Sequence, residues 1–366
     1  MTALSGLWNS IQSWLFPTLE QEVGELSDKQ KEFVGVCELC NLENHIAPYR
    51  WKYSGRKRQE RLSLVKAFTA KAVHNFSTTR ALIDYLENCA TLRRLCGWES
   101  KGEIPSESTF SRAFAEFAQG QLPQKVHEAM INNLYSPKLT GHVSRDSTPI
   151  HGREKPVKPI KEEDTEEKPK RKRGRPRKSE KRPPLPPSKL TVQLKRTLEE
   201  NLKDLSTCCN VGTKRNSKGY KSSWIGYKLH LDCVDGDIPV SGVVTSASVH
   251  DSQVAIPLTQ MTAKRVTSLY DLMDSAYDAP EIYQISKRYG HVPIIDHNKR
   301  RGEKKEMAPA QKIRYNERST AERVNSNLKD NYGGNNVRVR GEAKVTAHLM
   351  FGIIALTANQ LMKLLI

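Results

Sequence analysis

Residues 224–248 read WIGYKLHLDCVDGDIPVSGVVTSAS, and this stretch decides the fold expected for the second part of the chain. Two runs rich in β-forming residues, 224–234 and 238–248, flank the turn residues Asp-Gly-Asp at 235–237. That pattern predicts two antiparallel strands joined by a hairpin. Upstream, HVSRDSTPI at 142–150 alternates weakly between polar and apolar residues and predicts a third strand.

Beyond the hairpin, helical and strand patterns alternate, which predicts a mixed β-sheet with helices on its faces. The expected elements are a helix opened by Asp251, a strand at 267–274, a helix at 280–290, a strand at 292–296, a long helix from about Tyr315 and a terminal helix. The fold class is therefore α/β for residues 136–366. In such a sheet, active residues are expected at strand ends and on helix faces.

Residues 1–135 predict a separate all-α domain, because apolar residues recur at three- and four-residue steps and no alternating run is present. Within it, a short helix, a turn through 97–105 and a second helix fit a helix-turn-helix, but they also fit an ordinary helical bundle. In the first case Thr109, Ser111 and Arg112 would face DNA phosphates.

An insertion at 152–190 interrupts the predicted catalytic domain. Residues 153–189 carry 15 Lys or Arg and 7 Asp or Glu, are rich in proline and hold almost no apolar residues, which predicts a disordered loop. Within it, Arg173-Gly174-Arg175-Pro176-Arg177 is similar to an AT-hook, whose arginines enter a narrow minor groove. A nonspecific polycationic tether and a solvated spacer remain alternatives.

The composition points to a polyanionic partner. The net charge is +18, which favours double-stranded DNA over neutral partners. The most apolar C-terminal run, 349–356, is too short to span a membrane and predicts a buried helix, and the N-terminal run has no secretion signal. We therefore expect a cytoplasmic, DNA-associated protein with reduced thiols, in which the lone CxxC of Cys37 and Cys40 packs rather than binds metal.

The segment YNERSTAERVNSNLK at 315–329 carries the most specific pattern. At the helical angle per residue, one face presents a phenol, a guanidinium, a carboxylate and an ammonium, while a second face is apolar. The first set is Tyr315, Arg318, Glu322 and Lys329; the second is Ala321, Val324 and Leu328. The alternative is a solvated face with intrahelical ion pairs.

Two aspartates upstream extend this pattern. Asp146 lies in the first predicted strand and Asp274 ends the fourth. Together with Glu322 they offer hard oxygen ligands for two Mg²⁺ or Mn²⁺ ions, the arrangement used in phosphodiester chemistry. The alternatives are a turn residue for Asp146 and a helix cap before Ala279-Pro280 for Asp274. Asp251 competes for the second position, but we interpret it as a helix cap.

These residues resemble the DDE transposases of bacterial insertion sequences, in the branch whose third motif reads Tyr-x2-Arg-x3-Glu-x6-Lys. Residues 315–329 match that motif without a gap, and the resemblance extends over residues 142–365. The other matches are Asp146-Ser147-Thr148 for the first motif, Asp274, Ala276 and Tyr277 for the second, and the His-Asp-Ser at 250–252.

The resemblance implies a ribonuclease H-like catalytic domain with Asp146, Asp274 and Glu322 as catalytic metal ligands. It also implies that Tyr315, Arg318 and Lys329 contact the transposon end and that the enzyme works as a homodimer on paired ends. Two other functions remain open from the sequence. One is a non-catalytic, transposase-derived regulatory protein that binds DNA; the other is a junction resolvase or ribonuclease on the same fold.

Overall fold

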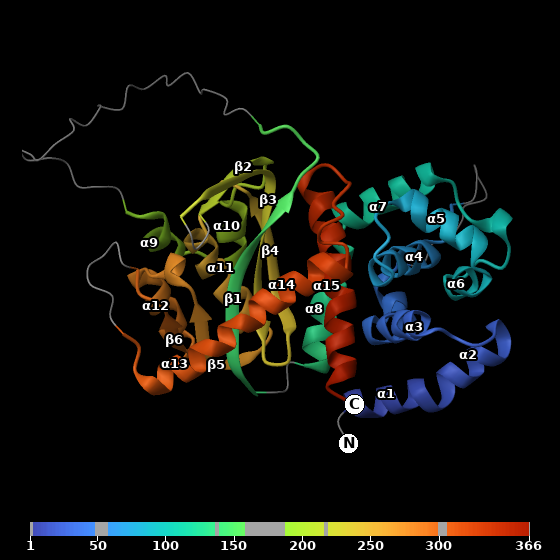
Figure 1. The fold of residues 1–366 in the computed structure, drawn as a ribbon, viewed down its shortest axis with the longest axis horizontal. Helices are drawn as coiled ribbons and strands as arrows, with labels where there is room; N and C mark the ends of the chain where they lie inside the picture. Colours follow the sequence, from blue (N-terminus) through green and yellow to red (C-terminus); the bar gives the residue numbers. More distant parts are fainter. Residues whose placement is uncertain are drawn as a thin grey trace, which may run out of the picture.

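A mixed sheet of six strands forms the centre of the second part of the chain (Figure 1). The structure is a computed structural model that describes residues 3–47, 58–135, 139–157, 187–215, 219–298 and 306–365. The strands are β1 (Leu139–His151), β2 (Asn210–Arg215), β3 (Lys221–Val234), β4 (Ile238–Ser246), β5 (Thr267–Met273) and β6 (Val292–Ile295).

Strand β1 is central in this sheet. It pairs antiparallel with β3, where Asp146 lies opposite Leu231, and parallel with β5, where Ser144 lies opposite Leu272. Strand β4 pairs antiparallel with β3, as the hairpin pattern predicts, and β6 extends the parallel half beside β5. All five predicted strands are present.

Three elements at 189–215 were not predicted from the sequence. Strand β2 pairs with the first half of β3, and the short helices α9 (Lys189–Gln193) and α10 (Leu198–Lys203) precede it. The run NVGTKR in β2 is mostly exposed and contains a glycine, so it lacks the apolar alternation by which a strand is recognised.

Helices cover both faces of the sheet. Helix α11 (Ser252–Ala263) packs on β3 and β4, and α12 (Pro280–Arg288) packs on α11. On the other face, α14 (Ser319–Asn331) crosses in front of β1 (Figure 1). A mixed sheet flanked by helices, joined to an all-helical N-terminal part, is the fold class that the sequence predicts.

The prediction of one continuous helix from about Tyr315 is wrong. Helix α13 (Pro309–Tyr315) ends there, residues 316–318 form a 3₁₀ turn, and α14 begins at Ser319. The hydroxyl of Ser144 on β1 donates a 2.6 Å hydrogen bond to the carbonyl oxygen of Arg318. A side chain that takes a carbonyl of the helical ladder is a known cause of such a break.

The N-terminal part is helical throughout the residues that the structure describes there. Its α-helices are α1 (Ala3–Ser10), α2 (Phe16–Val23), α3 (Asp28–Cys40), α4 (Arg61–Val73), α5 (Thr79–Asn88), α6 (Ala90–Leu95), α7 (Glu107–Gln119) and α8 (Leu122–Leu134). Ser106 occupies the position before α7, but its hydroxyl bonds to those of Ser108 and Thr109 instead of a backbone amide.

The last helix, α15 (Glu342–Lys363), stands between the sheet and the helical part (Figure 1). It packs on α3, α4, α7 and α8 on one side and on β4 on the other. Among the described helices it is long and apolar enough to cross a membrane, but 78% of that stretch is buried within the fold. The expected buried helix at 349–356 is confirmed. Because the core runs across α15, the domain boundary at 135/136 stays a prediction.

Candidate active site

Asp146 points from β1 towards α14. Its Oδ2 accepts a 3.2 Å hydrogen bond from Nδ2 of Asn325. Burial, with a smaller contribution from the neighbouring Asp274, raises the pKa of the Asp146 carboxyl to about 6, against the opposing effects of the Ser147 backbone N–H, Lys214 and Arg318. The carboxylate predicted from the sequence is therefore half-buried and lies on the central strand of the sheet.

The preceding residue fixes the strand from the opposite face. Successive side chains of a strand point to opposite faces, so Arg145 points towards α11. Its guanidinium makes two 2.7 Å hydrogen bonds to the carboxylate of Asp232 on β3, and Thr262 of α11 donates to the same carboxylate at 2.6 Å. This fully buried pair holds β1 in register behind Asp146.

Asp274 follows directly after β5, the parallel neighbour of β1. Its Oδ1 accepts from the backbone N–H of Ala276 at 2.9 Å and so caps the 3₁₀ turn Ser275–Tyr277. Asp274 is therefore a helix cap before Ala279-Pro280, as the alternative interpretation has it, but of this short 3₁₀ helix; the residue that precedes α12 is Ala279. Burial raises the pKa of Asp274, and the nearby Asp251 adds to the rise.

Asp251 is not the helix cap that the sequence suggests. It occupies the position before α11, but its side chain makes no capping hydrogen bond. Its Oδ1 instead accepts from Nζ of Lys228 at 2.9 Å, because the β3 ammonium reaches the carboxylate in the partly buried space between strand and helix. The pKa of Asp251 is lowered although burial opposes this, since His230 and Lys228 lie beside it.

Glu322 lies on α14, the helix that packs on β1, but it is not grouped with the aspartates. Its Oε1 accepts from a guanidinium nitrogen of Arg318 at 2.6 Å, and its side chain is 53% exposed. Within the part of the chain that the structure describes, no three acidic, cysteine or histidine side chains are grouped closely enough to hold a metal ion. The structure thus brings Asp146 and Asp274 together and leaves Glu322 paired with Arg318.

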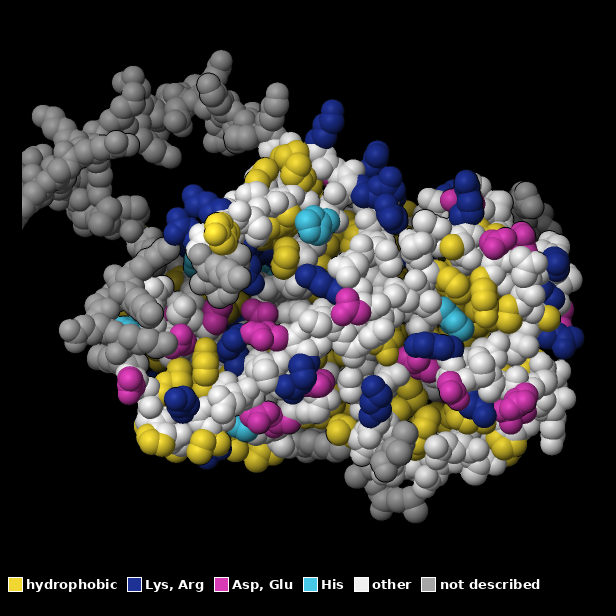
Figure 2. Space-filling model, in the orientation of Figure 1, with side chains coloured by type: hydrophobic (Ala, Val, Ile, Leu, Met, Phe, Trp, Pro, Cys, Tyr) yellow, Lys and Arg dark blue, Asp and Glu magenta, His cyan; other side chains and the backbone are white. Residues whose placement is uncertain are grey.

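The other residues of the motif line the same region. The Arg318 guanidinium lies 5.7 Å from the ring centre of Tyr315, whose pKa burial raises to about 12 and which also feels the charge of Asp274. At the far end, Lys329 lies near Asp146, and burial together with Lys214 lowers its pKa. Figure 2 shows this face, with acidic and basic side chains interleaved over the sheet.

Asn325 and Lys214 belong to this site, and the sequence did not reveal either. Asn325 lies 179 positions from the aspartate that it contacts, so no local pattern relates the two. Lys214 lies on the unpredicted strand β2. The one available signal is spacing, since Asn325 follows Glu322 by three residues and so lies one helical turn further on.

The donor set suits a divalent cation. Asp146 and Asp274 are carboxylates raised in pKa by burial, and among the described residues neither forms an ion pair with a basic side chain. Partly buried, unpaired carboxylates are stabilised by a hard cation, and oxygen ligands favour Mg²⁺ or Mn²⁺. Glu322 can become the third carboxylate ligand only if its ion pair with Arg318 breaks.

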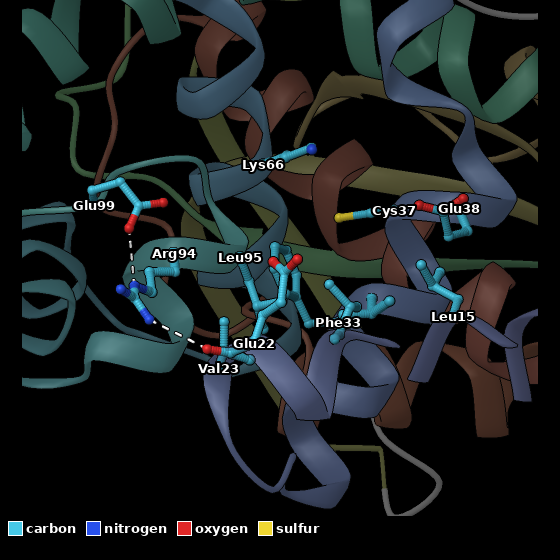
Figure 3. A pocket seen from close by; sticks show the side chains of 12 residues that line it. Leu15, Glu22, Val23, Phe33, Cys37, Glu38, Lys66, Arg94, Leu95 and Glu99 are labelled. Atoms are coloured by element: carbon cyan, nitrogen blue, oxygen red, sulfur yellow. Dashed lines mark hydrogen bonds and ion pairs between the residues drawn. The ribbon is translucent and has the colours of Figure 1, made fainter. Parts of the chain in front are cut away.

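Other features singled out in the sequence lie elsewhere. Cys40 is buried, its Sγ 4.0 Å from Sδ of Met130, and burial raises the pKa of both Cys37 and Cys40. Cys37 also lines a pocket of about 520 Å³ between α2, α3 and α6, where Arg94 bonds to Glu99 (Figure 3). The predicted AT-hook-like residues Arg173 to Arg177 lie outside the described residues.

Comparison with known families agrees with this geometry. The model of a family described as transposase DDE domain matches residues 140–358, from β1 to α15. A second model, described as a transposase domain (DUF772), matches residues 21–116 of the helical part. Searches of curated proteins and of solved structures give no match.

Proposed function

The chain belongs to the transposase family with a DDE domain, and from this membership we propose that it cleaves the ends of a mobile DNA element and joins them to target DNA. The observation that carries the proposal is the pair of half-buried aspartates, Asp146 on β1 and Asp274 directly after β5, the parallel neighbour of β1, with α14 packed on β1. Members of this family use divalent metal ions.

We assign the metal ligands to Asp146, Asp274 and Glu322, holding two Mg²⁺ or Mn²⁺ ions. When bound, the two cations would activate the attacking water or 3′ hydroxyl and stabilise the leaving oxygen. Asn325 orients the Asp146 carboxylate by its hydrogen bond, and the buried Arg145–Asp232 pair fixes the strand behind it.

The basic half of the site binds the phosphate. Arg318 lies between Glu322 and Asp146, so its guanidinium can pass from the glutamate to a phosphate oxygen of DNA. Tyr315 supports that guanidinium through its ring, and Lys329 holds the backbone further along α14. We also propose that two copies act together on paired ends and that the Arg173–Arg177 segment contacts the minor groove.

Metal-dependent nicking of a duplex that carries the terminal inverted repeat tests the proposal. We expect nicking with Mg²⁺ or Mn²⁺ and its loss, by at least about a hundredfold, in Asp146→Asn, Asp274→Asn and Glu322→Gln. The matched control is Glu317→Gln, an exposed glutamate five residues before Glu322, which is expected to keep wild-type activity.

Full activity in both Glu322→Gln and Asp146→Asn would overturn the site assignment. Binding of DNA without cleavage under any metal would favour the regulatory alternative. Cleavage of four-way junctions or RNA hybrids in preference to inverted repeats would favour a resolvase or a ribonuclease.

A further inference from the structure

Five basic side chains surround a cavity of about 490 Å³ between the helical part and the end of α14. They come from three separate segments of the chain and are Lys71, Arg153, Arg338, Arg340 and Lys344. Aromatic rings, among them Phe76 and Phe114, line the same cavity. We call this set of residues the basic cleft. In Figure 2, dark blue side chains gather near the top, above the junction of sheet and helical part.

The charge of the basic cleft is uncompensated. Within the described ranges, none of its five cations forms an ion pair with a carboxylate. The acidic side chain in its lining, Glu107, already pairs with Arg80 at 3.1 Å. Like charges held around one cavity repel each other, so an anion is the ligand that would relieve the repulsion.

Hydrogen bonds between distant segments hold the cleft together. Oε1 of Glu154 accepts from the backbone N–H of Gly341 at 2.7 Å, which places Arg153 beside the Arg340 segment. The side-chain amide of Asn75 donates to the carbonyl oxygen of Asp330 at 2.8 Å and ties the α4–α5 loop to the end of α14. The cations are thus presented by a fixed framework.

Lys71 gives the clearest indication of a ligand. Burial lowers the pKa of its ammonium to about 8, and none of the described side chains or carbonyl groups accepts a hydrogen bond from that ammonium. The neighbouring His348 offers no compensation, because its Nε2 is bonded to the Gly333 carbonyl oxygen and burial lowers its pKa to about 4. The N-terminus of α5 also opens here, with Ser77 to Thr79 in the lining, and a helix N-terminus favours anions.

We propose that the basic cleft binds the sugar-phosphate backbone of the DNA substrate, a proposal that rests on the proposed function. Helix α14 connects the two sites, because it carries Glu322 at the proposed active site and ends directly before Tyr332, which lines the cleft. Ten residues at 1.5 Å each span about 15 Å, and a duplex advances about 3.4 Å per base pair. A backbone that passes both sites therefore meets the cleft roughly four base pairs from the cleaved bond.

Duplex binding in the presence of EDTA, measured as a function of salt, tests the cleft without catalysis. Loss of two phosphate contacts in Arg338→Ala/Arg340→Ala is expected to weaken binding for every DNA sequence and to reduce the salt slope by about two units. The matched control, Lys203→Ala/Lys287→Ala, removes two exposed charges on α10 and α12 and is expected to leave affinity within about twofold and the slope within about one unit. Unchanged affinity and slope in the cleft variant would overturn the proposal.

Two further measurements separate this proposal from the proposed function. Neutral methylphosphonate linkages placed three to six positions from the cleaved bond are expected to weaken duplex binding by the wild type but not by the cleft variant. Equal weakening in both proteins would contradict the proposal that the cleft binds the DNA backbone. Lys71→Met is expected to weaken binding while the protein melts no lower than the wild type. If the wild type binds duplex with a steeper salt slope than the cleft variant but never cleaves, the result would contradict the proposed nuclease activity and leave the cleft proposal intact.

Discussion

At the scale of single residues, Glu322, the third metal ligand that we propose, is paired with Arg318. The pair spans one helical turn and the glutamate side chain is 53% exposed. Such a surface pair is worth about 0.3–0.5 kcal/mol, far less than a carboxylate gains from a divalent cation. Little free energy therefore keeps Glu322 away from the two aspartates.

Asp146 gives a pH-dependent prediction about stability. Its pKa is about 6 in the folded protein against 3.8 for an ordinary aspartate, so the folded state binds the proton more tightly. The metal-free protein then loses stability as the pH rises from about 4 to about 6. Asp146→Asn cannot ionise and is expected to be more stable than the wild type by about 1–3 kcal/mol at pH 7.

Denaturant unfolding in EDTA across this pH range measures the effect. The two proteins should converge below about pH 4, and added Mg²⁺ should stabilise the wild type but not Asp146→Asn. A variant that is equally stable at pH 7, or a difference that grows on acidification, would contradict the burial argument. The matched control is Asp330→Asn, at an exposed aspartate of α14, which should show neither effect.

The residues that could be predicted from the sequence are those with a local signature. Asp146 lies within a predicted strand, Asp274 ends another, and Glu322 shares a helix face with residues at a recognisable spacing. Asn325 and Arg145 act through contacts with residues 179 and 87 positions away. Such contacts depend on how the strands and helices pack, so no window of sequence contains them.

At the scale of elements, the contact between α14 and α15 positions the helix that carries Glu322. Gly352 of α15 packs against the end of α14, where an added Cβ would meet the Tyr332 carbonyl oxygen and lie 2.9 Å from Cδ1 of Leu328. Gly352→Ala is therefore expected to destabilise the protein by about 1–3 kcal/mol through overpacking, although alanine favours helices.

Equilibrium unfolding compares this variant with Gly6→Ala in α1, where nothing lies within 4 Å of the added Cβ. The control is expected to be neutral or stabilising by up to about 1 kcal/mol. Equal effects of the two substitutions would mean that the α14–α15 contact is looser than the structure shows.

Elements with strong periodicity were predictable and elements set by tertiary contacts were not. The hairpin β3–β4 and the parallel strands β5 and β6 carry apolar β-formers bounded by turns, so their patterns suffice. The break at residues 316–318 depends on a hydroxyl of β1, and β2 depends on the exposed first half of β3. The sequence of residues 316–318 and that of β2 therefore give no sign of the contact that determines their structure.

At the scale of the whole molecule, the two parts share one core. Phe351 of α15 lies 5.9 Å from Phe68 of α4, ring centre to ring centre, and the same helix covers β4. A continuous apolar core of this kind couples the helical part to the sheet. With a shared core of this kind, we expect the two parts to unfold together.

This coupling gives the last prediction. Ile282 of α12 is fully buried in a small cluster with Met273 and Ile295, apart from the core around α15. Ile282→Ala is expected to cost about 2–4 kcal/mol. If the molecule is one cooperative unit, amides of α4 in the helical part lose the same amount of hydrogen-exchange protection as amides of β5 beside the substitution.

Loss of protection confined to the sheet, or two unfolding transitions in calorimetry, would instead show two independent domains joined at α15. The boundary predicted near residue 135 would then mark a thermodynamic division of the molecule.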